Sequence, residues 1–335
     1  MLLIGCVGAE QPEPTLRSLA PFPIGAALSP KLLTNHPDYR RTVEQEFSSI
    51  TSENVLKMHH VHPEKDRYDF SGGDALVTYA ARTGKRMHGH ALVWHEAVPK
   101  WVTEFQGDSA TWEGLLRDHI KTVVRNNIGQ IAAWDVVNEA FMDDGTLRKS
   151  IWSEKLGPDF VARAFRYARE FNPGVKLFYN DYGQEYSPRK LAAILNMVAD
   201  FKRRGVPIDG IGLQMHTNVN QSDSLIENAL RRTAATGLLV HISELDVRVN
   251  PGKLPNFTPT DEHWQRQRQK YAAIVRAYRR AVPKDQQYGI TFWNVSDGDS
   301  WIPKFCQCQD FPLPFDARYR RKPAYTGISE SLSDK

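Results

Sequence analysis

Segments that resemble strands alternate with segments that resemble helices along almost the whole chain, and this alternation constrains the fold more than any other feature. Eight short runs of aliphatic and β-branched residues are each followed by a helical stretch. Strict alternation of this kind predicts a parallel sheet covered by helices. Eight units in about 310 residues predict a single (β/α)8 barrel of the TIM type, because no glycine-rich dinucleotide-binding turn follows the first strand.

The predicted elements follow one another from residue 21 onward without a linker or an internal repeat. The expected strands are residues 22–28, 48–55, 86–93, 131–138, 175–180, 209–215, 238–245 and 288–295. The expected helices are residues 38–47, 73–83, 111–127, 158–171, 188–204, 223–236 and 261–281, with a short helix after Pro323. We therefore expect one domain over residues 21–335.

The first 20 residues form a separate segment. Residues 1–7, M-L-L-I-G-C-V, resemble the end of a bacterial lipoprotein signal in which Cys6 carries the lipid anchor. A truncated start or an ordinary apolar N-terminus would explain the same letters. We expect residues 1–20 to be a signal remnant or tether, and the protein to be secreted or bound to the cell envelope.

Composition narrows the function classes. Hydrophobic residues make up 41% of the chain and charged residues 24%, as in an ordinary globular protein. A net charge of +4, scattered along presumed helices, does not favour nucleic acid as a partner. No apolar run approaches the ~20 residues of a membrane span. We expect Cys306 and Cys308 to be free thiols, because a disulfide across a single residue would be strained.

Two glutamates follow buried-type strands. The fourth expected strand runs A-A-W-D-V-V and ends in Asn138 and Glu139, and the seventh leads into Glu244. Glutamate is seldom fully buried unless it is paired, and barrel enzymes collect their chemistry at the carboxyl ends of the strands. Two carboxyl groups that flank one bond are the equipment for cleaving a glycosidic linkage. The eight Trp and twelve Tyr residues offer rings that can stack on sugars.

Other polar and aromatic residues recur at the same ends of successive strands. They are Glu53, Asn54, Lys57, His88, His90, Trp94, His95, Asn180, Asp181, Tyr182, Gln214, His216, His241, Asp246, Trp293, Asp297, Asp299 and Trp301. Each one alone is compatible with a role in the core, where a lone histidine or tryptophan usually serves packing. Their recurrence at one end of the barrel indicates a binding site instead.

Seven motifs in order resemble family 10 of the glycoside hydrolases, the endo-β-1,4-xylanases, over about residues 24–324. They are S-E-N-V-L-K-M at 52–58, G-H-A-L-V-W-H at 89–95, W-D-V-V-N-E-A at 134–140, Y-N-D-Y at 179–182, G-L-Q-M-H at 212–216, I-S-E-L-D-V at 242–247 and F-W-N-V-S-D-G-D-S-W at 292–301. The resemblance implies a family 10 catalytic domain that acts on xylan and xylooligosaccharides with retention and without a cofactor or metal. We expect a monomer.

The resemblance also implies roles for single residues. It makes Glu139 the acid/base and Glu244 the nucleophile. The residues expected to bind substrate are Glu53, Asn54, Lys57, His90 and Trp94 on the non-reducing side, Asn138, Gln214, His216, Trp293 and Trp301 around the cleavage point, and Tyr182 on the leaving side. From position alone, we expect a partly apolar setting for Glu139. We also expect His216 and His241 beside Glu244, with Asp246 orienting one of them.

The chain departs from the family pattern at two positions and in one loop. Ala97 stands where the family usually has a sugar-binding glutamine, and Ile302 where many members have arginine. The loop 303–314, which contains both late cysteines, is also unusual. These changes leave both glutamates in place, and they concern the sugars on the non-reducing side.

Two other functions compete with this interpretation. His88-Gly89-His90 is the H-x-H of metal-dependent amidohydrolases, with His216, His241 and Asp297 as further ligands, although that family places H-x-H on the first strand. A non-catalytic sugar-binding protein would keep the aromatic residues and lose a carboxylate. Because Glu139 and Glu244 are both present, the sequence favours an enzyme.

Overall fold

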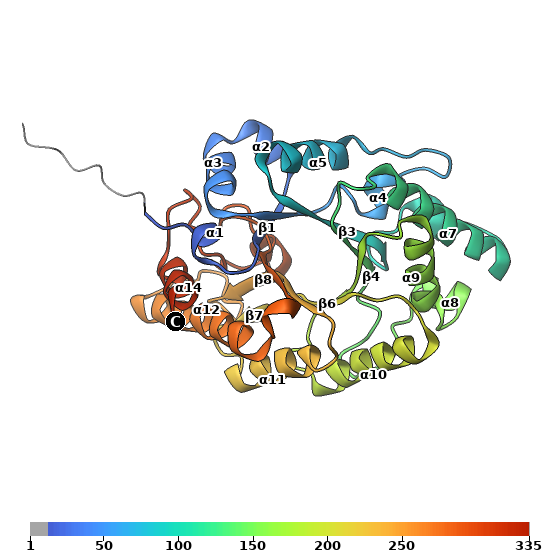
Figure 1. The fold of residues 1–335 in the computed structure, drawn as a ribbon. Coiled ribbons are helices and arrows are strands. Elements are labelled where there is room, and N and C mark those ends of the chain that lie inside the picture. Colours follow the sequence, from blue (N-terminus) through green and yellow to red (C-terminus); the bar gives the residue numbers. More distant parts are fainter. Residues whose placement is uncertain (1–12, 335) are drawn as a thin grey trace, which may run out of the picture.

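A closed ring of parallel strands forms the centre of the computed structural model, which describes residues 13–334 (Figure 1). The strands are β1 (Ile24–Leu28), β2 (Ser49–Ser52), β3 (Arg86–Trp94), β4 (Ala133–Asn138), β5 (Lys176–Asp181), β6 (Gly210–Leu213), β7 (His216–Asn218), β8 (Leu239–Arg248) and β9 (Gln287–Phe292). Their order is β6-β5-β4-β3-β2-β1-β9-β8-β7, and the pairing of β6 with β8 closes the ring and leaves β7 on β8. The predicted (β/α)8 barrel is confirmed.

Helices surround the barrel, and their ends follow the sequence signals. The longer helices are α3 (Pro37–Glu46), α5 (Ser71–Thr83), α7 (Ser109–Asn126), α9 (Phe160–Phe171), α10 (Pro188–Arg204), α11 (Asp223–Ala234), α12 (Asp261–Ala281) and α14 (Pro323–Ser333). In α10, the Ser187 side chain accepts a hydrogen bond from the Lys190 amide, and Gly205 ends the helix at φ 63°. The predicted bounds of α10 and α12 agree with the structure.

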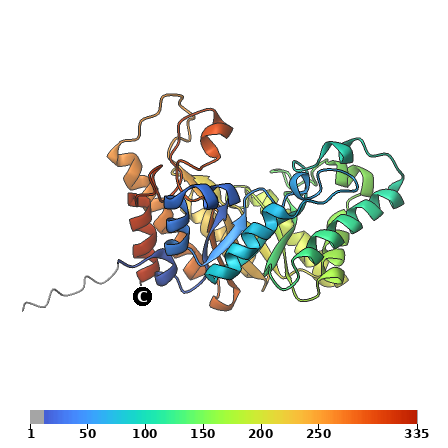
Figure 2. The same cartoon turned by 90° about the horizontal axis from the view of Figure 1, so that it is seen from above.

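Short helices lie in the loops between these elements. They are α1 (Leu16–Leu19), α2 (Pro30–Asn35), α4 (Met58–Val61), α6 (Lys100–Thr103), α8 (Ile151–Leu156), α13 (Ile302–Cys306) and a 3₁₀ turn, η1 (Lys284–Gln286). The loops after β8 and β9 rise together from one end of the barrel, where α13 stands clear of the body (Figure 2). Hydrogen bonds join these loops, for example from the Asn250 side chain to the Gln309 carbonyl at 2.9 Å.

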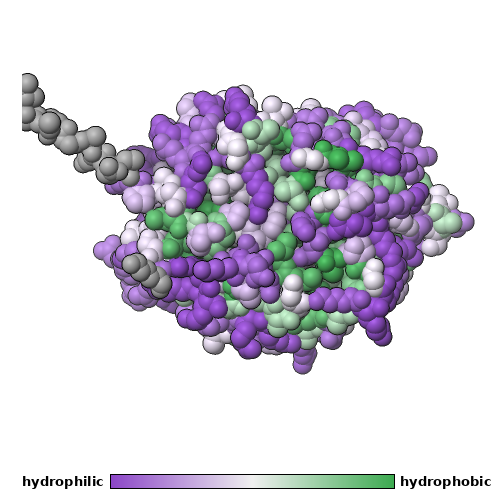
Figure 3. All heavy atoms as spheres, in the orientation of Figure 1, coloured by the Kyte–Doolittle hydropathy of each residue, from purple (hydrophilic) through white to green (hydrophobic). Residues whose placement is uncertain are grey.

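Hydrophilic residues predominate on the face in Figure 3, with apolar residues in patches between them. Within residues 13–334, the helices are either too short or too polar to cross a bilayer. At the N-terminal side, Leu16 is fully buried in the core, so the packed structure includes residues that we assigned to the tether. Cys6, the expected lipid-anchor residue, lies outside the described residues.

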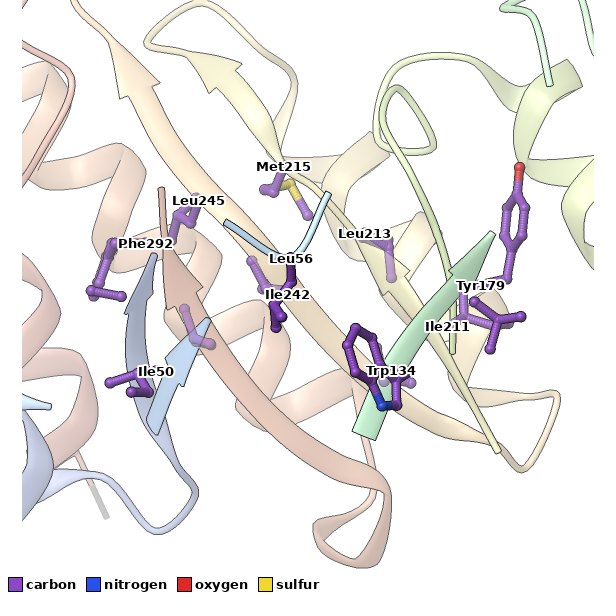
Figure 4. Close-up of a cluster of buried hydrophobic side chains, with 14 of the residues drawn as sticks. Ile50, Leu56, Trp134, Tyr179, Ile211, Leu213, Met215, Ile242, Leu245 and Phe292 are labelled. Atoms are coloured by element: carbon purple, nitrogen blue, oxygen red, sulfur yellow. The ribbon is translucent and has the colours of Figure 1, made fainter. Parts of the chain in front are cut away.

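Large apolar side chains fill the layer between the barrel strands and the surrounding helices, where a glycine on a neighbouring strand makes room for one of them. Trp134, Ile211, Ile242 and Phe292 are among the buried side chains in Figure 4. A Cβ atom on Gly89 would lie 2.3 Å from the Trp134 ring, so only glycine leaves room for this indole. Apolar packing of this density fixes the strands, and with them the side chains at the strand ends.

One predicted strand differs from the structure in a way that concerns the site. The expected strand 209–215 is cut short at Leu213, where β6 ends, and β7 begins beyond it at His216, because Met215 adopts φ 63° between the two. β6 pairs with β8 deep in the barrel, whereas β7 pairs with β8 at its carboxyl end. A continuous run of letters therefore contains a break, and Gln214 and His216 lie on its two sides.

Candidate active site

A cleft of about 660 Å³ lies at the carboxyl ends of the strands. It is lined by Glu53, Asn54, Lys57, His90, Trp94, Glu96, Asn138, Glu139, Arg148, Tyr182, Tyr186, Gln214, His216, Glu244, Trp293, Trp301 and Phe305. The structure thus brings together both expected catalytic glutamates and every expected substrate-binding residue. Asp246 lies behind this lining, where it contacts His216.

Glu139 follows β4 immediately and has φ 59°, a conformation that residues other than glycine adopt rarely. Its amide donates to the Asn180 carbonyl at 2.9 Å, which holds this turn. Its carboxyl accepts hydrogen bonds from Trp94 Nε1 at 2.9 Å and Gln214 Nε2 at 2.9 Å. Asn138 Nδ2 donates to the same group at 3.2 Å. The surroundings are therefore more polar than the apolar run before Glu139 indicated.

Glu244 lies within β8 and is buried. Asn180 Nδ2 donates to its Oε1 at 2.7 Å, and His216 Nε2 is 3.2 Å from its Oε2. Burial on its own would raise the pKa of Glu244. The hydrogen bond from His216 and the nearby charges of the histidines outweigh burial and bring this pKa below its ordinary value. Glu244 is therefore held as an ionised carboxylate in the cleft.

His216 owes its charge to a carboxylate behind it. Its Nδ1 lies 2.8 Å from Asp246 Oδ2, and Trp301 Nε1 donates to the same oxygen at 3.0 Å. Burial would lower the pKa of His216, but Asp246 and Glu244 together raise it to about 10. This imidazolium carries a proton on each nitrogen and can donate to both carboxylates at neutral pH.

The expectation that His241 lies beside Glu244 was wrong. His241 Nε2 contacts the Thr291 hydroxyl at 2.8 Å, and its ring packs against His88 deep in the barrel. Three residues along a strand span about 10 Å, so His241 lies far below the cleft. Burial and the neighbouring His88 keep the pKa of His241 well below its ordinary value.

The side of the cleft formed by β2 and β3 carries a buried lysine among aromatic rings. Lys57 Nζ donates to Asn54 Oδ1 at 3.1 Å and lies 4.8 Å from the centre of the Trp94 ring. Burial lowers the pKa of Lys57, while Glu244 and Glu53 oppose this shift. Burial also raises the pKa of Glu53. Such donors and rings suit the hydroxyl groups and flat faces of a neutral sugar.

On the opposite side of the cleft, formed by the loops after β4 and β5, buried and charged residues hold Tyr182 in place. Tyr182 lies over Lys190, whose Nζ is 3.3 Å from the ring centre. Lys190 Nζ also pairs with Asp181 at 2.8 Å, and both side chains have 0% exposure. Burial raises the pKa of Asp181 to about 6 against the opposing effect of Lys190. Arg148 donates to the Tyr182 hydroxyl and to the Glu139 carbonyl, each at 2.9 Å.

Four residues that line the cleft were missed in the sequence, namely Glu96, Arg148, Tyr186 and Phe305. Glu96, Arg148 and Tyr186 lie in loops and Phe305 lies in the short helix α13, where no strand-end pattern marks them. The exposed fractions of Tyr186 and Phe305 are 41% and 65%, which is high for aromatic residues. The two departures from the family pattern do not line the cleft, because Ala97 and Ile302 are 3% and 2% exposed and pack beneath it.

The expectation of free thiols at Cys306 and Cys308 was also wrong. The two residues form a disulfide, and their Cα atoms lie 5.2 Å apart. Gln307 adopts the left-handed conformation at φ 51°, which turns the chain back and brings the two sulfur atoms together. The disulfide closes the end of α13, next to Phe305.

The ligand set of the competing metal enzyme is dispersed. His88 and His90 lie at 3.0 and 2.9 Å from the two oxygens of Asp135. His216 is hydrogen-bonded to Glu244, His241 lies deep in the barrel, and Asp297 pairs with Lys322 at 2.8 Å. Within the described part of the chain, the one group of three side chains close enough to share an ion is His95, Glu96 and Glu139.

Known proteins are similar to this chain in sequence and in fold. The sequence model of glycosyl hydrolase family 10 matches residues 17–331. Endo-1,4-beta-xylanase A of Cellvibrio japonicus is 36% identical over 351 residues, and the match covers 96% of this chain but 57% of that protein. Endo-1,4-beta-xylanase B of Thermotoga neapolitana is 34% identical, and the match covers 100% of this chain and 96% of that protein. A mutant of Xylanase10C from Cellvibrio japonicus, solved in complex with xylopentaose, has a similar structure, with a TM-score of 0.91 at 34% identity. This match covers 95% of the present chain and 69% of the solved chain.

Proposed function

Because the chain belongs to glycosyl hydrolase family 10, we propose that it hydrolyses internal β-1,4 bonds of xylan with retention of configuration. The observation that carries this proposal is that two carboxyl groups in one cleft have different hydrogen-bond partners. Glu244 is held ionised by the His216 imidazolium, whereas Glu139 lies across the cleft on Gln214 and Trp94. A nucleophile and a separate acid are what a retaining glycosidase needs.

The first chemical step breaks the glycosidic bond. Glu139 donates its proton to the glycosidic oxygen, and the leaving sugar departs over Tyr182 and Arg148. A Glu244 oxygen attacks the anomeric carbon and forms a glycosyl ester. The hydrogen bond from Asn180 orients this carboxylate.

The second step releases the product. Glu139, now a carboxylate, takes a proton from a water molecule that attacks the same anomeric carbon. The ester bond to Glu244 breaks, and its carboxylate returns to His216 and Asn180. Two inversions give net retention. Asn138 contacts Glu139 and Asn180, and it is placed to hydrogen-bond the 2-hydroxyl of the reacting sugar, a contact that strengthens in the transition state.

Product release from glucuronoxylan, arabinoxylan, cellulose and mixed-linkage glucan tests the substrate. We expect rapid formation of xylooligosaccharides from the xylans, with the β-anomer formed first in proton NMR spectra. Turnover of a glucan with none of xylan would contradict the substrate and leave the two-glutamate chemistry intact.

Variants of the two glutamates test the chemistry. Glu139→Gln should lower turnover of xylan by about 10²–10⁴-fold, the usual contribution of a general acid/base. An aryl xylobioside with a good leaving group should form its glycosyl ester faster than xylan does in this variant. A 2-fluoro xylobioside should label the native protein on the peptide that contains Glu244, and Glu244→Gln should stay unlabelled. Glu104→Gln, at an exposed carboxylate directly after α6, is the matched control.

A further inference from the structure

Phe305 is the most exposed large hydrophobic residue within residues 13–334, at 65% exposure. Exposed phenylalanines on loops are common, so exposure alone carries no argument. Phe305 also lines the cleft, and its ring centre lies 4.8 Å from that of Trp301. The ring is therefore placed where substrate passes, and it has an aromatic neighbour on the inner side.

A row of rings runs from the reacting centre to Phe305. The His216 ring, which contacts Glu244, packs against Trp293 at 6.4 Å and Trp301 at 4.9 Å between ring centres. The indole of Trp301 is anchored by its hydrogen bond to Asp246. Phe305 is the outermost ring of this row, so a sugar over it lies beyond the sugars at the cleavage point.

The backbone beneath Phe305 is fastened at several points. Ile302, at the start of α13, is buried, and the Cys306–Cys308 disulfide closes the end of this helix. The Cys308 amide donates to the Pro303 carbonyl at 3.3 Å, and Arg248 Nη2 lies 3.7 Å from the Cys308 sulfur. Arg248 is itself paired with Asp310 at 3.0 Å. A ring held in place before binding loses little conformational freedom when a sugar stacks on it.

We propose that Phe305, together with Trp301, forms an additional stacking site for a xylopyranose unit of the main chain, outside the sugars that contact Glu139 and Glu244. The inference rests on the proposed function for its substrate class. A flat sugar ring presents C–H groups on its faces, and an aromatic ring covers them without needing a charged partner. The disulfide-closed helix α13 presents this ring at the rim of the cleft.

Binding measured in a Glu244→Gln background tests this site without turnover. The dissociation constants of xylotriose, xylotetraose, xylopentaose and xylohexaose should be measured by calorimetry, with and without Phe305→Ala. We expect the added substitution to raise the dissociation constant of xylohexaose by roughly two- to tenfold, the range for one aromatic contact. The dissociation constant of xylotriose should rise less. Phe305→Trp should restore the affinity for long chains, and Ile128→Ala, at an exposed site away from the cleft, should have no effect.

Two other outcomes of the binding experiment would overturn the inference. An equal loss at every chain length would mean that Phe305 supports the cleft as a whole, and no loss at any length would mean that the ring binds nothing. Failure of the Glu244→Gln protein to bind any xylooligosaccharide would contradict both proposals. If the native protein hydrolyses no xylan while chain-length-dependent binding persists, the proposed function alone fails.

Discussion

Asn180 donates a hydrogen bond of 2.7 Å from Nδ2 to Glu244 Oε1, and the same nitrogen lies 2.9 Å from Asn138 Oδ1. Ser243 donates to Asn180 Oδ1 at 2.6 Å and fixes the orientation of the amide. Asn138 in turn contacts Glu139. One buried amide therefore ties the proposed nucleophile to the residue beside the proposed acid, and its chemistry can be tested directly.

Replacing Asn180 by aspartate should remove this donor without changing the volume of the side chain. The new carboxylate would face Glu244, repel its charge and raise the pKa of Glu244. We expect kcat/KM on xylan to fall roughly 100-fold, similar to the loss of one preorganised donor. Initial rates over a range of xylan concentrations measure this effect. Asn35→Asp, at an exposed position on α2, should behave like the native protein, and equal losses in both variants would contradict the assigned role.

Removing the imidazolium should shift the pH dependence of activity. His216→Asn takes away the proton donor that keeps the pKa of Glu244 below its ordinary value. The acidic limb of the kcat/KM profile, which reports the nucleophile of the free enzyme, should therefore move to higher pH. His60→Asn, at an exposed position, should leave that limb in place. An unmoved limb in the His216 variant would show that another group controls the charge of Glu244.

The same histidine should make stability depend on pH in the alkaline range. The pKa of His216 is raised to about 10 in the folded state, against about 6.5 in an unfolded chain. Its contribution is therefore complete below pH 6.5 and is lost as the pH rises towards 10. Melting temperatures of the native protein should fall over this window more steeply than those of His216→Asn. Parallel curves for the two proteins would count against the ion pair with Asp246.

A methyl group on Gly212 should disturb the site from beneath. A Cβ atom there would lie 2.2 Å from Asn180 Oδ1, and Asn180 is fully buried and hydrogen-bonded on both sides of its amide. We expect Gly212→Ala to lower activity on xylan at least tenfold through displacement of Asn180. Gly114→Ala, which has open space around its Cβ position on α7, is the control. Full activity of Gly212→Ala would show that the amide can move without consequence.

The buried pair beneath Tyr182 should matter for stability. Lys190→Met leaves the Asp181 carboxyl buried without its partner, and breaking such a pair typically destabilises a protein by about 3–5 kcal/mol. Urea unfolding should show a loss of this size, and Lys149→Met, at an exposed lysine, should show little change. The loss should shrink as the pH falls towards about 6, because the Asp181 carboxyl without Lys190 takes up its proton above the pKa of about 6 that it has beside this lysine.

The sequence alone was sufficient for the barrel and for the two glutamates. Glu139 lies where β4 ends, and Glu244 lies inside β8, four residues before that strand ends at Arg248. The links between them could not be found in this way. The contacts of Asn180 with Glu244 and Asn138 join residues 64 and 42 positions apart, and they depend on how neighbouring strands are aligned.

The errors have similar causes. His241 is close to Glu244 in sequence, but a pleated strand carries it about 10 Å deeper into the barrel. The Cys306–Cys308 disulfide depends on the left-handed conformation of Gln307. Glutamine rarely adopts this conformation, so the sequence does not predict it. Phe305 lies in α13, a helix of five residues that is too short to show a periodicity in the sequence, so its place at the cleft follows only from the packing of this helix.

The break between β6 and β7 gives Gln214 a second task. Its amide side chain donates to Glu139 Oε1 at 2.9 Å, while its backbone carbonyl accepts the Glu244 amide at 3.0 Å. Gln214 thus links the carboxyl group of Glu139 to the main chain of Glu244. A retaining glycosidase needs its two carboxyl groups close together, and an inverting one needs them farther apart. A change to the inverting mechanism in this barrel would therefore have to break or lengthen the link that Gln214 provides.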